Sequence, residues 1–178
     1  MTDRSTPVQV GTAANWQTVA AGYGRTMAVR NDGTLWGWGQ NTFGDLGDGT
    51  TTDRSSPVQA GTATNWQTVA VEWLHTAGVR SDGTLWVWGN GAFDQFGNGT
   101  RSSQSSPVHM GTVTNWQTVT VGYSDTVALR SDGTLWTWGD NAWGALGNGS
   151  STAPNLSPGK VGLPLFITQP QSSILRGS

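Results

Sequence analysis

Few residues in this chain could carry out acid–base chemistry. Besides the aspartates, they are two histidines, His75 and His109, and one glutamate, Glu72. A histidine can act as a general base near neutral pH, but no Ser-His-Asp spacing accompanies either one, and a carboxylate pair for glycoside hydrolysis would have to be assembled from distant segments. We interpret His75 as a structural residue that bonds to the backbone of a turn, and His109 as a surface residue. The sequence therefore predicts no catalytic residue and no enzyme.

Three aspartates beside glycines, Asp45, Asp48 and Asp53, could suggest a calcium loop. Their spacing does not match an EF-hand, and the residues fifty positions later are not acidic, so we interpret them as turn residues. The glycines at 44, 47 and 49 precede no helix and lie near no lysine, so they do not form a phosphate-binding loop. We predict no metal site and no cofactor.

The best candidate binding residues lie where an otherwise repeated sequence varies. The chain repeats with a period of fifty residues, and differences gather in two kinds of segment, at 21–25, 71–75 and 121–125 and at 41–46, 91–96 and 141–146. Repeated residues hold a fold, whereas aromatic side chains beside charges are typical of contact surfaces. The predicted binding residues are Tyr23, Arg25, Glu72, Trp73, Leu74, His75, Tyr123 and Asp125.

These loops must be positioned by a repeated hairpin. An Asp-Gly turn followed by a tryptophan-bearing strand occupies 32–39 and returns at 82–89 and 132–139. Asp-Gly favours tight hairpins because the turn needs positive φ, and alternation places Trp36 and Trp38 on one face of the strand. A Pro-Val segment at 5–11, 55–61 and 105–111 predicts an edge strand, since proline cannot donate to an interior ladder.

Such a period, with about four short strands per copy and no helical pattern, is the signature of β-propeller blades. The fold class is therefore all-β, with three blades of four antiparallel strands. The recurring tryptophans at 16, 36 and 38 and their copies are assigned to the core, and Trp143, which replaces a phenylalanine of the other copies, is assigned to packing.

Three motifs carry a resemblance to a known family. They are Val-Ala-Ala-Gly-x-x-x-Thr, Asp-Gly-Thr-Leu-Trp-x-Trp-Gly and Gly-x-Leu-Gly-x-Gly-Thr, and they cover residues 1–150 in three copies. The chain resembles the repeats of the regulator of chromosome condensation. The resemblance implies a β-propeller, which in that family usually closes with seven blades. Members of the family bind small GTPases, chromatin or enzymes that they inhibit.

The repeats define the expected organisation of the chain. Residues 1–50, 51–100 and 101–150 form three propeller repeats, 151–163 form a fourth edge strand and linker, and 164–178 form a tail. The tail resembles the opening strand of immunoglobulin-like domains found beside such repeats in secreted bacterial proteins. The chain is expected to be a segment of a longer array, or to complete its ring with copies of itself.

Composition excludes several classes of partner. The net charge is −2 and there is one lysine, so no electrostatic surface for nucleic acid or an anionic membrane is expected. There is no cysteine and no apolar run long enough to cross a membrane. The opening residues lack a signal-peptide pattern, so the chain as it stands is expected in the cytoplasm, whereas a parent array with such a tail would be secreted.

Three blades leave two open faces, which would expose more apolar surface than a monomer normally does. Head-to-tail association into a ring would cover them, and two copies, giving six blades, are favoured over three. The N-terminal segment at Pro7-Val8 could pair with a neighbouring copy's third blade, or the chain's own segment near Val161 could take that place.

The sequence thus predicts a non-enzymatic protein-interaction scaffold that assembles with itself. The alternative is a carbohydrate-binding module in which Tyr23, Trp73 and Tyr123 are stacking platforms, so a further protein or a glycan remains an open partner. A likeness of 72–76 to a motif of the plant ultraviolet-B photoreceptor is weaker, because Leu74 stands where that motif has arginine.

Overall fold

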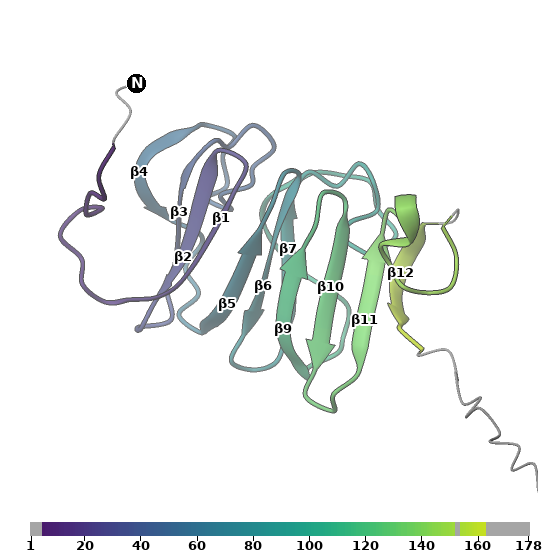
Figure 1. Cartoon of the computed structure of the whole chain (residues 1–178). Helices are drawn as coiled ribbons and strands as arrows, with labels where there is room; N and C mark the ends of the chain where they lie inside the picture. Colours follow the sequence, from purple (N-terminus) through teal and green to yellow (C-terminus); the bar gives the residue numbers. More distant parts are fainter. Residues whose placement is uncertain (1–4, 152–153, 163–178) are drawn as a thin grey trace, which may run out of the picture.

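The computed structural model describes residues 5–151 and 154–162. It contains three four-stranded antiparallel sheets that stand side by side in chain order (Figure 1), which confirms the predicted all-β class. The expected tail at 164–178 lies outside the described residues. No helix among the described residues is long and apolar enough to cross a membrane.

Each sheet is one blade, and its strands follow one another across the sheet. The first blade contains β1 (Trp16–Gly22), β2 (Arg25–Arg30), β3 (Leu35–Gly39) and β4 (Arg54–Gln59). The second contains β5 (Trp66–Val71), β6 (His75–Arg80), β7 (Leu85–Gly89) and β8 (Gln104–His109). The third contains β9 (Trp116–Val121), β10 (Asp125–Arg130), β11 (Leu135–Gly139) and β12 (Asn155–Lys160), with a short 3-10 helix, η1 (Ala142–Gly144), between β11 and β12.

The Asp-Gly turns form the central hairpin of each blade. Gly33 has φ 76°, a conformation that costs glycine least. Asp32 Oδ1 accepts hydrogen bonds from the amide and the hydroxyl of Thr34, at 3.0 and 2.6 Å, and the Thr34 hydroxyl in turn accepts one from Trp36 Nε1 at 2.8 Å. The same bonds recur at Asp82 and Asp132. The repeated local sequence therefore sets the same hairpin three times.

The outer strand of each blade comes from the next repeat. β4 pairs with β3 and β8 with β7, so each blade is completed across a repeat boundary. In the third blade this place belongs to the chain's own β12, which pairs with β11. The edge strand expected at 5–11 was wrong, because no strand in the described chain precedes it and the segment lies outside every sheet.

The core lies between the blades. Met27, Val29 and Leu35 of the first blade pack against Trp66 and Trp88 of the second. The equivalent face of the second blade packs in the same way against Trp116 and Trp138 of the third. Each blade thus offers a tryptophan face to the preceding blade and an aliphatic face to the following one.

Arginines join paired tryptophans on each tryptophan face. The Arg80 guanidinium lies 4.6 Å from the Trp66 ring and 3.6 Å from the Trp86 ring, and Arg30 and Arg130 lie in the same way in the other blades. Cation–π contacts of this kind stabilise by about 0.5–2 kcal/mol. The assignment of Trp143 to packing was wrong: its side chain is 98% exposed, in a loop of the third blade that has no following blade beside it, and the equivalent Phe43 and Phe93 are also exposed, at 42% and 51%.

Candidate functional site

The three variable loops between the first two strands of each blade bring an aromatic side chain to one place. The ring centroids of Tyr23 and Trp73 are 3.6 Å apart, and those of Trp73 and Tyr123 are 5.6 Å apart and stacked. Because the blades follow chain order, Trp73 lies between the two tyrosines. The predicted aromatic residues therefore form one continuous stack, in which the tyrosines are half-exposed.

Arg25 is buried beneath this stack rather than exposed on it. Its Nη2 atom donates to the carbonyl oxygens of Trp73, at 2.7 Å, and Glu72, and lies 3.5 Å from Asp45 Oδ1. Burial lowers the pKa of Arg25, although Asp45 and Glu72 raise it in part. Burial likewise raises the pKa of Asp45 more than the arginine lowers it. Arg25 therefore links the first two blades and is not exposed as a ligand-binding residue.

His75 is also a structural link between blades. Its Nε2 atom is 2.8 Å from the hydroxyl of Thr126, and that hydroxyl donates to the carbonyl of Gln95 at 2.8 Å. Because the hydroxyl proton is engaged, His75 Nε2 must be the donor. Complete burial, helped by the charge of Arg25, lowers the pKa of His75 to about 3. The expected backbone partner in the turn was wrong; the partner is a side chain of the next blade.

The other predicted residues divide between surface and core. Leu74 is buried, whereas Glu72 is partly exposed. Asp125 is half-buried at the start of β10, and burial, together with the nearby charge of Asp140, raises its pKa. His109 lies on the outer strand β8, exposed as expected, with its ring 5.1 Å from Trp86.

A cavity of about 170 Å³ lies beside the stack. It joins Tyr23, Arg25 and Trp73 to Phe43 and Asp45 of the glycine-punctuated loop. Sequence reasoning named the first three as binding residues and missed the other two, although 41–46 was already marked as variable. The two kinds of variable segment therefore meet at the same end of the first blade.

We expect Trp73→Ala to lower the free energy of unfolding by about 1–3 kcal/mol, because it removes two aromatic contacts worth about 0.5–1.5 kcal/mol each. Urea denaturation followed by circular dichroism measures the change. Trp143→Ala is the matched control, since that indole is almost fully exposed and its loss should change stability by less than about 0.5 kcal/mol. Equal effects of the two variants would show that the stack contributes nothing to the fold.

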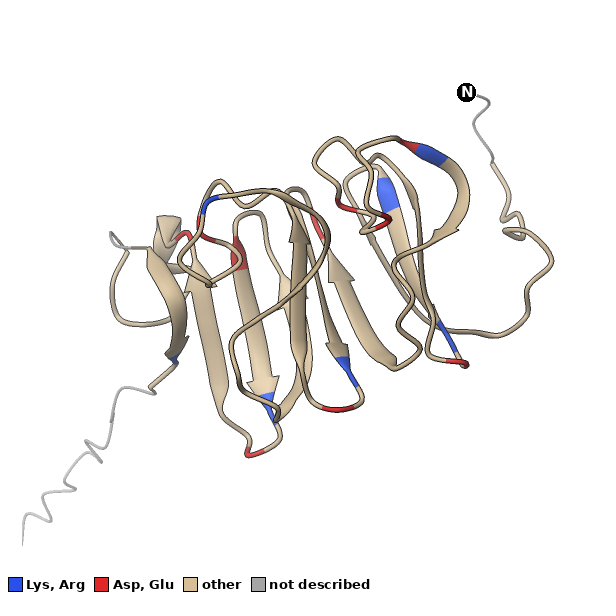
Figure 2. Cartoon of the chain, turned by 180° about the vertical axis from the view of Figure 1, so that it is seen from behind, with Lys and Arg blue, Asp and Glu red and all other residues tan. Residues whose placement is uncertain are grey.

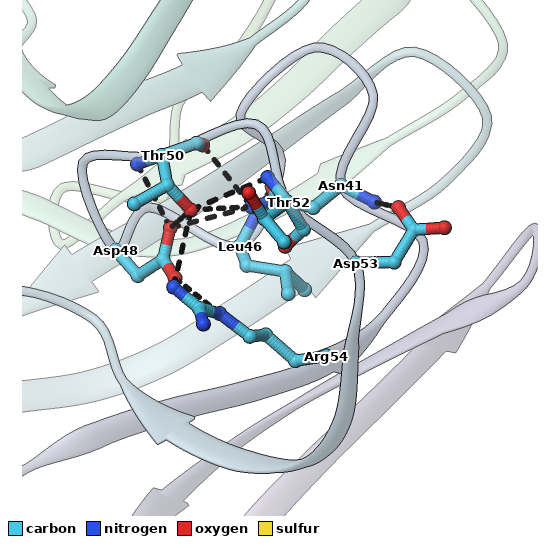
Figure 3. A network of polar contacts seen from close by, with 7 residues as sticks. All are labelled: Asn41, Leu46, Asp48, Thr50, Thr52, Asp53 and Arg54. Atoms are coloured by element: carbon cyan, nitrogen blue, oxygen red, sulfur yellow. Dashed lines mark hydrogen bonds and ion pairs between the residues drawn. The ribbon is translucent and has the colours of Figure 1, made fainter.

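The aspartates of the glycine-rich loop hold the loop itself (Figure 3). Asp48 accepts from the amide and hydroxyl of Thr50, at 2.9 and 2.7 Å, and pairs with Arg54 at 2.7 Å. Asp53 Oδ1 accepts from the amide of Asn41 at 2.8 Å. Among the described residues no group of acidic or histidine side chains could hold a metal ion. The interpretation of these aspartates as turn residues agrees with these contacts.

Two hydrogen bonds that sequence reasoning missed join consecutive blades at each internal seam. The carbonyl of Asp45 accepts from Thr76 Oγ1 and Trp88 Nε1, both at 2.8 Å. The carbonyl of Gln95 accepts in the same way from Thr126 Oγ1 and Trp138 Nε1, at 2.8 and 3.0 Å. The signal was present, because this threonine and this tryptophan recur in every copy, at 26 and 38 in the first.

The end blades expose the faces that are covered elsewhere. Val19, on the tryptophan face of the first blade, is 70% exposed, whereas its copy Val119 is 7% exposed. Leu135, on the aliphatic face of the third blade, is 40% exposed, whereas Leu35 and Leu85 are fully buried. A mainly apolar hollow of about 290 Å³, lined by Trp16, Val19 and Trp38 among others, marks the first of these faces.

Sequence and structural comparisons agree with this architecture. The regulator of chromosome condensation (RCC1) repeat matches residues 32–79, 82–129 and 132–172, and a second description of that repeat matches 16–45 and 116–144. None of the curated protein sequences matches the chain.

Solved propellers share the fold at low identity. Human WBSCR16 superposes with a TM-score of 0.77 at 22% identity, over 86% of this chain and 39% of its own. Prp20p from Saccharomyces cerevisiae gives 0.74 at 20% identity, over 84% and 39%, and yeast RCC1 (Prp20) bound to Kap60 gives 0.73 at 20%, over 84% and 37%. The chain thus spans about two fifths of the length of these structures. With most of its length matched by the repeat, the chain belongs to the family of regulator of chromosome condensation (RCC1) repeat proteins.

Proposed function

We propose that this chain is a non-enzymatic protein-interaction scaffold whose three blades assemble head-to-tail with further copies into a closed ring. The observation that carries the proposal is the pair of complementary end faces. The first blade presents a tryptophan face that no other blade covers, although Gln9, Val10 and Ala13 of the N-terminal segment lie at its hollow, and the third blade presents an aliphatic face that no blade covers. These are the two kinds of surface that meet at both internal seams. The occupant that fits each face is therefore a second copy of the chain.

Backbone geometry supports the same pairing. At the internal seams the amide of Trp66 donates to the carbonyl of Gly33 at 3.0 Å, and the amide of Trp116 donates to Gly83 at 3.0 Å. The next pair in this series is the amide of Trp16 and the carbonyl of Gly133, which lie at opposite ends of the chain. A head-to-tail contact would make the third bond of the series.

The edges of the sheets do not oppose assembly. Because β12 completes the third blade, each chain contributes three whole blades and needs no strand from a neighbour. The N-terminal segment is therefore not required as the closing strand of another copy. Two copies would give six blades and three would give nine. Six is nearer to the seven with which propellers of this family usually close, so we favour a dimer.

Binding of a further protein would use the loops at the open ends of the blades. Charged residues lie mostly in turns and at strand ends, and the middles of the strands contain few of them (Figure 2). Prp20p from Saccharomyces cerevisiae is described with binding properties to Gsp1p and histones. By analogy we propose a protein partner for this chain as well, contacted through the half-exposed tyrosines, Glu72 and the surrounding loops.

The glycan alternative receives less support from the geometry. A sugar-binding tryptophan presents an open ring face, and Trp73 has Tyr23 and Tyr123 as neighbours at 3.6 and 5.6 Å. These contacts make the aromatic residues a packing unit rather than separate platforms.

Light scattering combined with size-exclusion chromatography tests the assembly. We expect a mass of twice the 18.8 kDa chain. Val19→Arg, which places a charge on the tryptophan face, and Leu135→Arg, which places one on the aliphatic face, should each give monomers, because a buried unpaired charge is strongly unfavourable. Mixed together, the two variants should form a one-to-one pair, since one head and one tail remain intact.

A wild-type chain that stays monomeric at every concentration would overturn the proposal. So would assembly that survives both substitutions, because the ring would then use other surfaces. A single variant that still forms dimers on its own would contradict the head-to-tail arrangement and favour one in which like faces meet.

A further inference from the structure

One end of the blades carries the exposed aromatic side chains of the chain. We call it the aromatic end, and it is formed by the variable segments at 21–25, 71–75 and 121–125 and at 41–46, 91–96 and 141–146. Among the described residues, the exposed phenylalanines, tyrosines and tryptophans are Tyr23, Phe43, Phe93, Tyr123 and Trp143. The opposite end, with the Asp-Gly turns, has none in the described chain. Exposed apolar side chains gathered in this way mark an interaction surface.

These side chains form two rows that run across the blades. The first row is the stack in which Trp73 lies between Tyr23 and Tyr123. The second row recurs every fifty residues in the glycine-punctuated loops, at positions 43, 93 and 143. Tyr23 and Phe43 line the same cavity, so the two rows meet in the first blade. The aromatic surface is therefore continuous from one variable segment to the other.

The cations of the aromatic end are already paired. Its ion pairs join Arg25 to Asp45, Arg54 to Asp48 and Arg101 to Asp94. Each of these arginines is thus matched by one carboxylate of its own blade or loop. The remaining carboxylates of this end therefore decide its net charge.

Three further carboxylates lie at this end without an ion pair in the described part of the chain. They are Glu72, Asp125 and Asp140. Asp140 lies close enough to Asp125 that its charge, after burial, is a further cause of the raised pKa of Asp125. Like charges at such a distance favour a cation between them. The aromatic end therefore combines exposed rings with unpaired negative charge.

The chain itself shows which cation suits tryptophan rings. At the opposite end, the guanidinium groups of Arg30, Arg80 and Arg130 each lie between 3.6 and 4.6 Å from the centroids of two tryptophan rings. A guanidinium stacks on an aromatic face and can pair with a carboxylate in its own plane, whereas an ammonium is more strongly hydrated. Arginine is therefore the side chain that fits a surface of rings and carboxylates.

We propose that the aromatic end binds an arginine-containing segment of another protein, whose guanidinium groups stack on the two aromatic rows and pair with Glu72, Asp125 and Asp140. The inference rests on the proposed scaffold function, because it names the class of partner, but it does not require the ring. Phe43 and Phe93 stay exposed beside the two internal seams. A third seam, between copies, would therefore leave the aromatic end open as well.

Isothermal titration calorimetry with three synthetic peptides of equal length tests the proposal. In these peptides glycine alternates with arginine, lysine or glutamine. The arginine peptide should bind at least about fivefold more tightly than the lysine peptide, and the glutamine peptide should not bind. Trp143→Ala should weaken binding of the arginine peptide about fivefold, and Glu72→Gln about threefold.

Two control variants should leave the affinity unchanged. Leu156→Ala removes an exposed apolar side chain from the outer strand of the same blade as Trp143. Asp132→Asn removes one negative charge at the opposite end, and asparagine keeps the acceptor for the amide of Thr134, which lies 2.9 Å from Asp132 Oδ1. Circular dichroism of each variant establishes that the fold is retained.

Equal affinities for the arginine and lysine peptides, unchanged by Trp143→Ala, would overturn the proposal, because net charge alone would then explain binding. Equal losses in Asp132→Asn and Glu72→Gln would overturn it in the same way. If neither basic peptide binds but a cello-oligosaccharide does, the surface belongs to the glycan alternative. Light scattering of the same wild-type protein reports on the ring independently, so loss of the peptide contact and loss of the assembly are separate results.

Discussion

Gly83→Ala is expected to destabilise the fold by about 3 kcal/mol or more, whereas Gly133→Ala is expected to leave the fold of a single chain almost intact and to prevent assembly. Both glycines occupy the same Asp-Gly turn, with φ 76° and 80°. Both substitutions therefore carry the same cost of about 1–2 kcal/mol for a side chain in the left-handed region. Any difference between the two must come from the surroundings.

The surroundings differ because of the seam. A Cβ atom at Gly83 would overlap the carbonyl oxygen of Thr114 in the next blade, and the blades would have to move apart. A Cβ atom at Gly133 meets nothing within 4 Å in its own chain. In the proposed ring, however, it would meet the carbonyl of Ala14 of a second copy, because Ala14 occupies the position of Thr114 in the first repeat.

Urea denaturation of both variants in the monomeric Val19→Arg background measures the first effect, and light scattering of Gly133→Ala alone measures the second. Equal destabilisation of the two variants would show that the backbone conformation, and not the seam, determines the cost. A Gly133→Ala chain that still assembles like the wild type would contradict the proposed contact.

The chain is expected to lose about 2 kcal/mol of stability between pH 7.5 and pH 5 through His75 alone, because its pKa falls from 6.5 to about 3 on burial. The unfolded chain takes up the proton as the pH falls below 6.5, while the folded chain does not. Stability is therefore fully present above pH 6.5 and declines by about 1.4 kcal/mol per pH unit below it.

His75→Gln isolates this effect, since glutamine keeps a donor for Thr126 but does not titrate. The difference between the pH profiles of the wild type and the variant, measured by urea denaturation, should flatten above pH 7. Burial raises the pKa of Asp45, which favours the folded state on acidification, but that group is present in both chains and cancels in the comparison. Parallel profiles would show that His75 is solvated in the folded chain.

The regular part of this fold could be predicted because it depends on local chemistry. The Asp-Gly turns and the alternation of Trp36 and Trp38 with smaller residues define hairpins without reference to distant contacts, and the hairpins form as expected. The first edge strand was wrong for a non-local reason. Its copies form strands only because a tryptophan strand of the preceding repeat is available to pair with them.

The candidate site was harder to predict, because side chains that vary between copies can face either solvent or a seam. Tyr23 and Tyr123 are half-exposed, but Arg25 and His75 lie in the same loops and are buried across seams. Their burial depends on the carbonyls of Trp73 and Glu72 and the hydroxyl of Thr126, and spacing along the chain does not reveal such partners. Trp143 was misassigned because an aromatic side chain that replaces another aromatic one suggests packing, whereas this position is exposed in all three copies.

Each blade takes its outer strand from the following sequence repeat, and this has a consequence for how the number of blades can change. β4 lies in the second sequence repeat but completes the first blade, and β8 lies in the third repeat but completes the second blade. A chain that ended at residue 50 or 100 would therefore lack the outer strand of its last blade. Deletion or duplication of any fifty-residue window within the repeats, wherever it begins, would instead preserve every pairing, because donor and acceptor shift together. Recombination between unaligned copies would therefore change the number of blades while leaving each one whole.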